Sequence, residues 1–188
     1  ALLEGFRALS SARVLDDVLN LVMDSAIAVS GAERGFIMLA NEEEGLEFTT
    51  GRSQDRTTLP GSDFETSRKI PEEVFTTGHP RIEADLLDGD LATKHMGTIA
   101  LGIRNVLCVP LRLVRYTDAD TAPAEDRRIS VLYLDSREKG TLLASHTTAV
   151  LETLANEAAI AIENAKLYRT ALEKARLEQE MATAAEIQ

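Results

Sequence analysis

The sequence predicts an α+β fold in which a mixed body of strands and short helices is followed by one long helix. Two observations indicate this class. Short apolar runs bounded by turn residues fill the middle of the chain, and helical patterns lie at both ends. From about Leu142 to Gln188 there is no Pro or Gly to break a helix. At about 1.5 Å per residue this helix would be roughly 65 Å long, which is more than one small domain can cover.

Helices are expected before the first strand. Leu2 to Leu9 reads as a short helix that Ser10-Ser11 interrupts, and a second helix is expected from about Arg13 to Ser30. Gly31 follows as the expected helix-ending glycine. The apolar stripe of the second helix consists of Leu15, Val18, Leu19, Val22, Ala26 and Val29.

A β-hairpin is expected next. Arg34 to Ala40 is a strand that is apolar on both faces, and Leu46 to Gly51 is the returning strand. Residues 52–69 are polar and are expected to form a loop with at most a short edge strand. Pro71 to Thr77 follows as a short helix, because Pro is tolerated in the first turn and acidic residues come directly after it.

A second hairpin precedes the long helix. Residues 79–97 are expected to be loop with short helical turns. Asn105 to Arg115 and Ile129 to Asp135 are the expected strands, and the charged residues 116–128 form the loop between them.

Composition and charge exclude several classes of function. The 188 residues provide one ordinary domain plus extra helix. A net charge of −11 would repel nucleic acid, and no apolar run reaches the ~18 residues of a membrane span. The single cysteine, Cys108, fits a reducing cytoplasm and excludes a disulfide framework. The chain starts without Met and within a helical pattern, so we expect a fragment of a longer protein.

Four segments resemble the GAF family of sensory domains, in the order in which that family carries them. They are Gly31–Leu39 (GAERGFIML), Gly102–Leu111 (GIRNVLCVPL), Ile129–Asp135 (ISVLYLD) and Leu154–Tyr168 (LANEAAIAIENAKLY). The resemblance implies an α/β/α sandwich: a six-stranded antiparallel sheet, terminal helices packed on one face, and a loop-covered pocket on the other. The expected organisation is an N-terminal helical linker at 1–12, the GAF domain at 13–168, and a coiled-coil linker at 169–188.

The last twelve residues carry a second resemblance. Leu177–Gln188 (LEQEMATAAEIQ) is similar to the linker that precedes sporulation-type serine/threonine protein phosphatase domains, although linkers to histidine kinases and cyclases can look alike. The resemblance implies that this chain is not itself an enzyme and that the full-length protein is a metal-dependent phosphatase. Such an output domain would follow Gln188.

A ligand pocket, if the domain has one, is expected between the sheet and its covering loops. The candidate lining residues by strand position are Phe36, Met38, Phe48, Ile103, Val106, Cys108 and Tyr133. The alternative is that these are core residues around a collapsed pocket, because strands covered on both faces are apolar in either case. The sequence requires no cofactor, and it does not identify the small ligand.

The long helix carries an apolar seam with the spacing of a coiled coil. Its members follow in alternating steps of three and four: Leu151, Leu154, Ala158, Ala161, Ala165, Tyr168 and Leu172. We expect a parallel homodimer through this seam and the N-terminal helix. The step from Leu172 to Leu177 breaks the register, and residues 172–177 are therefore a candidate switch point.

The candidate metal and haem ligands form no complete motif in the sequence. His79, His95 and His146 are too far apart for a local metal motif, which leaves His95 only as a haem-ligand alternative. Asp118 and Asp120 begin a calcium-loop pattern that fails at Pro123.

The expected function is a cytoplasmic sensory and dimerisation module with no catalysis of its own. Two alternatives remain open at this point. One is a structural dimerisation spacer with an empty pocket, and the other is a thiol-based redox enzyme or sensor that uses Cys108.

Overall fold

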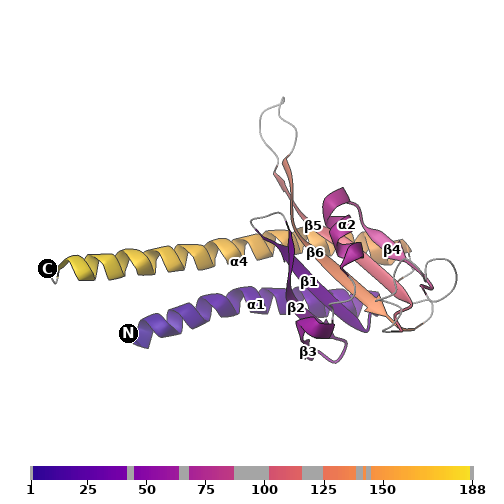
Figure 1. The fold of residues 1–188 in the computed structure, drawn as a ribbon, viewed down its shortest axis with the longest axis horizontal. Helices are drawn as coiled ribbons and strands as arrows, with labels where there is room; N and C mark the ends of the chain where they lie inside the picture. Colours follow the sequence, from indigo (N-terminus) through magenta and orange to yellow (C-terminus); the bar gives the residue numbers. More distant parts are fainter. Residues whose placement is uncertain are drawn as a thin grey trace.

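A six-stranded antiparallel sheet, with strand order β3-β2-β1-β6-β5-β4, forms the centre of the molecule (Figure 1). The computed structural model describes residues 2–41, 45–63, 68–86, 102–115, 125–138, 142 and 145–186. The elements are α1 (Leu2–Ser30), β1 (Arg34–Ala40), β2 (Leu46–Ser53), β3 (Thr58–Leu59), η1 (Gly61–Asp63), α2 (Lys69–Thr77), β4 (Arg81–Glu83), β5 (Asn105–Arg115), β6 (Glu125–Ser136) and α4 (Ser145–Glu186). The predicted α+β class and six-stranded antiparallel sheet are confirmed.

The N-terminal helix differs from its prediction. Residues Leu2–Ser30 form one α-helix, so the expected interruption at Ser10-Ser11 is wrong. Serine costs well under about 1 kcal/mol per residue in a helix, and two serines without Gly or Pro do not end one. The predicted end is confirmed, because the Gly31 N–H donates to the Ile27 carbonyl at 2.9 Å and Gly31 has a φ of 71°.

Two strand predictions also needed correction. Arg81–Glu83, which was expected to be loop, forms the edge strand β4 and pairs with Val106–Cys108 of β5. Three residues are too few to show a strand period in sequence. Strand β6 begins at Glu125, inside the expected loop, and pairs there with Arg115. This part of the β5–β6 hairpin projects beyond the body of the sheet (Figure 1), so its residues are charged rather than apolar.

The core has two layers, one on each face of the sheet. Alternation along β1 sends Ile37 toward the long helices and Phe36 and Met38 toward the opposite face. Gly35 of β1 faces Met23 and Ile27 of α1. A Cβ there would lie 2.8 Å from Leu134 Cδ2 and 3.1 Å from Met23 Cε, so any larger residue at this position would force these side chains to shift.

The long helices α1 and α4 run in opposite directions, side by side, and project past the sheet at the end where both termini lie (Figure 1). The first turns of α4 are part of the helix-side core, with Leu151, Ala155 and Ile162 fully buried. Ala165 is the last buried residue of α4 among those whose side chains are described. Beyond it, the helix leaves the domain as a partly or fully exposed rod.

Candidate functional site

The seven predicted pocket residues lie together on the sheet face that is opposite the long helices. Phe36, Met38, Ile103, Val106, Cys108 and Tyr133 are buried, and the partly buried Phe48 packs against them. The Phe36 ring lies 6.2 Å from the Phe48 ring and 6.1 Å from the Tyr133 ring, both in tilted contacts. Such contacts are favourable for aromatic pairs, so these side chains form a second core layer.

Helix α2 covers part of this layer. Its buried residues Ile70 and Val74 belong to the layer, and the partly buried Phe75 packs against it. The described side chains of α2 thus pack directly against this apolar face of the sheet. The use of this face as a ligand pocket stays a prediction.

A buried ion pair lies beside the second core layer. Arg34 of β1 and Asp135 of β6 are cross-strand partners. The Arg34 guanidinium donates to both carboxylate oxygens, at 2.9 and 2.6 Å, and lies 5.3 Å from the Phe36 ring centroid. Burial raises the pKa of Asp135, and the hydrogen bonds from Arg34 oppose that rise only in part. The pair joins the two central strands.

Cys108 lies in the middle of this layer and is fully buried. Desolvation raises the pKa of its thiol far above the ordinary value. Its cross-strand neighbour Arg81 is a cation, but the guanidinium is already paired with Glu83 at 2.6 Å and with Glu73 of α2. A reactive thiolate needs a basic and accessible setting, so this geometry disfavours redox chemistry at Cys108.

The predicted dimer seam lies mostly within a single copy of the chain. Leu151, Ala158 and Ala165 are buried in the helix-side core, and Leu154 packs against that core from its edge. Ala161 and Leu172 are half-buried, and Tyr168 is 54% exposed. The first half of the seam therefore joins α4 to its own domain. Its use by a second copy stays a prediction.

The structure shows a different apolar surface, which the sequence analysis missed. We call it the outward face; it consists of Val14, Leu21 and Ala28 of α1 together with Ile160 and Leu167 of α4. Leu21 is 68% exposed, Ile160 51% and Leu167 59% in the single chain. The members on each helix are seven residues apart, which places them on one side of it. That spacing was the signal in the sequence that could have revealed them.

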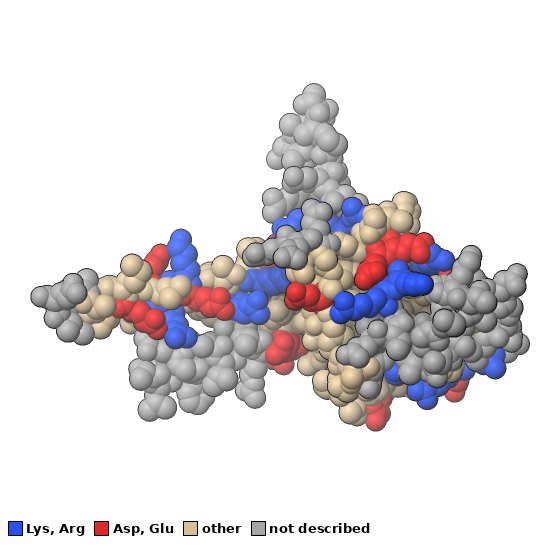
Figure 2. All heavy atoms as spheres, in the orientation of Figure 1, with Lys and Arg blue, Asp and Glu red and all other residues tan. Residues whose placement is uncertain are grey.

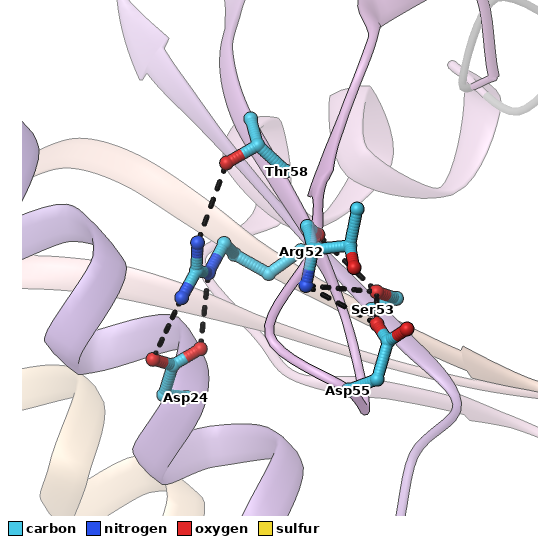
Figure 3. Close-up of polar contacts among 6 residues, drawn as sticks. Asp24, Arg52, Ser53, Asp55 and Thr58 are labelled. Atoms are coloured by element: carbon cyan, nitrogen blue, oxygen red, sulfur yellow. Dashed lines mark hydrogen bonds and ion pairs between the residues drawn. The ribbon is translucent and has the colours of Figure 1, made fainter.

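A polar network anchors α1 to the edge of the sheet (Figure 3). Arg52 of β2 donates to both carboxylate oxygens of Asp24 in α1, at 3.0 and 2.9 Å, and to the Thr58 hydroxyl at 3.3 Å. The hydrogen bonds with Asp24 raise the pKa of Arg52, and a hydrogen bond from Ser53 lowers the pKa of Asp55. The bidentate pair fixes the position of α1 relative to β2.

A groove of about 250 Å³ lies beside this network. Its lining residues are Asp24, Ile27, Ala28, Gly31, Ser53, Gln54 and Arg56. The groove holds no pairing of nucleophile and base, and its one acid is already held by Arg52. We assign it no chemistry.

The remaining candidates from the sequence have no support in the described residues. His79 is exposed, whereas His95, Asp118, Asp120 and Pro123 lie outside the described residues, as does the side chain of His146. In the described part of the chain, no three His, Cys, Asp or Glu side chains gather as a metal site would require. None of the described helices is long and apolar enough to span a membrane.

A GAF domain model matches residues 14–162, which is most of the chain, and the chain therefore belongs to the GAF family. GAF domains are sensory and regulatory domains of signalling proteins, and this chain carries such a domain. No curated protein sequence matches the chain.

Solved structures of GAF domains share this fold at low sequence identity. GAF3 from Synechocystis sp. PCC6803, in its photoproduct state, is similar with a TM-score of 0.62 and 13% identity over 82% of this chain and 96% of that one. A GAF domain/HD domain protein from Geobacter sulfurreducens is similar with a TM-score of 0.57 and 15% identity, over 81% of this chain and 94% of that one. The GAF domain of a two-component sensor histidine kinase from Bacillus halodurans is similar with a TM-score of 0.54 and 19% identity, over 81% of this chain and 96% of that one.

Proposed function

We propose that this chain is the dimeric sensory module of a cytoplasmic signalling protein. A small ligand or partner acts on the α2 side of the sheet, and α4 carries the resulting change to an output domain. The observation that supports this most directly is the course of α4. The helix belongs to the core as far as Ala165 and then continues to Glu186 past the end of the sheet, where most of its described side chains are exposed (Figure 1).

The exposed rod favours pairing with a second copy. Residues 170–184 of α4 are exposed apart from the half-buried Leu172, and an isolated helix of this length is marginally stable in water. Three i,i+4 ion pairs support it, namely Arg169–Glu173, Lys174–Glu178 and Arg176–Glu180. Figure 2 shows basic and acidic side chains lying close to one another on this projecting part of the molecule. Exposed pairs contribute only about 0.3–0.5 kcal/mol each, so a partner helix would supply the missing stabilisation.

The outward face gives the second copy a place to bind. It is apolar, it lies on both long helices, and it is exposed to water in the single chain. Large apolar side chains that are exposed at a regular spacing on two neighbouring helices are typical of an interaction site. A two-fold dimer would bury the α1 and α4 stripes of each copy against those of the other.

The proposed output is a serine/threonine protein phosphatase, on the strength of the resemblance of Leu177–Gln188 to phosphatase linkers. A kinase or cyclase output would use the same helical connection. The test is an insertion series of one to four residues after Glu173 in the full-length protein. Output that cycles with helical phase supports transmission by rotation or register, whereas output indifferent to insertion length means that α4 is only a tether.

A structural dimerisation spacer is the second candidate, and it is compatible with the packing of Ile70 and Val74 of α2 against the apolar sheet face. Native mass spectrometry of the purified chain separates the two candidates. A sensor carries or accepts a small molecule on this face, and its binding changes the packing of α4. A spacer retains only the polypeptide mass and accepts none.

A further inference from the structure

Two adjacent arginines of β6 contact helices on opposite faces of the sheet. Arg127 is paired with Glu163 of α4, and Arg128 holds the C-terminal end of α2. We propose that the Arg127-Arg128 dipeptide mechanically couples the covering helix α2 to the long helix α4. Its use in signalling rests on the proposed function, but the coupling itself is a property of the single chain.

On the α2 side, Arg128 binds the carbonyl groups at the C-terminal end of that helix. The last carbonyl groups of a helix lack partners within it and carry partial negative charge. The Gly78 N–H donates a hydrogen bond to the Val74 carbonyl at 2.9 Å. Arg128 Nη1 donates to the Phe75 carbonyl at 2.6 Å and also to the Thr76 carbonyl, and its guanidinium lies 5.8 Å from the Phe75 ring centroid. Because Arg128 comes from a distant part of the chain, this contact ties α2 to β6.

The α4 side of the link lies where that helix leaves the core. Arg127 Nη1 is 3.2 Å from Glu163 Oε1. The Glu163 side chain is largely covered, whereas Arg127 is mostly exposed. Glu163 comes directly after Ile162 and two residues before Ala165, the last buried residue described in α4. A displacement of Arg127 would therefore act on the last turn of α4 whose side chains are buried in the domain core.

Strand β6 carries both arginines and can therefore transmit a displacement from one contact to the other. Neighbouring residues of a strand point to opposite faces, which places Arg127 with α4 and Arg128 with α2. Both residues lie on the β5–β6 ribbon, where Arg127 pairs with Leu113 and Arg128 with Arg112. The register of the two strands shifts between Leu111 and Arg112, and a bulge of this kind increases local twist. Twisting of the ribbon would move both arginines together.

Hydrogen–deuterium exchange of the purified chain tests the coupling, because local opening raises the exchange of the affected amides. Arg128→Ala should raise exchange in α2 and also in α4 around residues 159–167. Glu163→Ala removes the Arg127 contact without altering β6 or lowering helix propensity, and it should raise exchange in α2 by about two- to fivefold, the range for an exposed ion pair. Arg127→Ala should match Glu163→Ala.

The matched control is Arg176→Ala, which breaks an ion pair with Glu180 on the exposed rod. It should leave exchange in α2 unchanged. The proposal is overturned if each variant affects only the helix that its own side chain contacts. It is likewise overturned if Glu163→Ala, which keeps the arginines intact, leaves α2 unaltered. The measurement needs neither a ligand nor an output domain, so it is independent of whether the sensory function holds.

Discussion

The Arg34–Asp135 pair is the most heavily buried charge contact among the described residues, with side-chain exposures of 13% and 2%. Removing one partner leaves the other charge without compensation in the core. We expect Arg34→Met to lower the free energy of unfolding by about 3 kcal/mol. The double variant Arg34→Met/Asp135→Leu should lose less, because it leaves no unpaired charge. Urea denaturation measures both, and a single variant as stable as the wild type would contradict the structural role of the pair.

The Cys108 thiol should be inert in the native protein. It is fully buried, and desolvation raises its pKa, so the thiolate scarcely forms at neutral pH. A thiol reagent should label the folded chain slowly and the urea-unfolded chain rapidly. Rapid labelling of the folded chain would restore the redox alternative.

The sequence predicted which face a residue occupies more accurately on the strands, where side chains alternate between the two faces of the sheet, than on the helices. Strand alternation placed the candidates on β1, β5 and β6 correctly on one face. On α1, Val29 was expected in the buried stripe but is 48% exposed, whereas Met23 and Ile27 are buried. Helix α1 has apolar residues toward the core and along the outward face, and periodicity alone cannot tell which apolar side meets the core.

At the scale of elements, α2 depends on a left-handed residue at its end. Gly78 has a φ of 71°, and a Cβ there would meet nothing closer than 3.6 Å. Gly78→Ala should therefore destabilise the chain by about 1 kcal/mol through backbone conformation alone. Gly78→Asn should cost less, because Asn tolerates this conformation better. Thermal unfolding compares the two variants, and equal losses would point to crowding instead.

The long, strongly patterned elements could be predicted from sequence and the short ones could not. Strands β1 and β5 and the helix α4 were predicted close to their observed bounds. The three-residue strand β4 forms because it completes the hydrogen bonding of β5, a tertiary effect that leaves no local pattern. The charged start of β6 belongs to a ribbon beyond the core, where the apolar signal of a strand disappears.

At the scale of the whole molecule, the family motifs predicted the fold, and no motif predicted the outward face. The seam from Leu151 to Leu172 was predicted as a dimer contact, yet much of it packs α4 against its own domain. A heptad spacing shows that two helices share a seam, but not whether they belong to one copy or to two. Only the burial of individual residues in the folded chain separates these cases.

Sedimentation of the purified chain tests the central claim, which is that two copies pair through the outward face. The wild type should sediment as a dimer, and Leu21→Glu/Ile160→Glu should sediment as a monomer with an unchanged circular dichroism spectrum, because both side chains are exposed in the single chain. Ile82→Glu, at an apolar position on the edge strand β4 that is also exposed (40%), is the control and should remain dimeric. A monomeric wild type, or a double variant that dimerises as tightly as the wild type, would contradict the account.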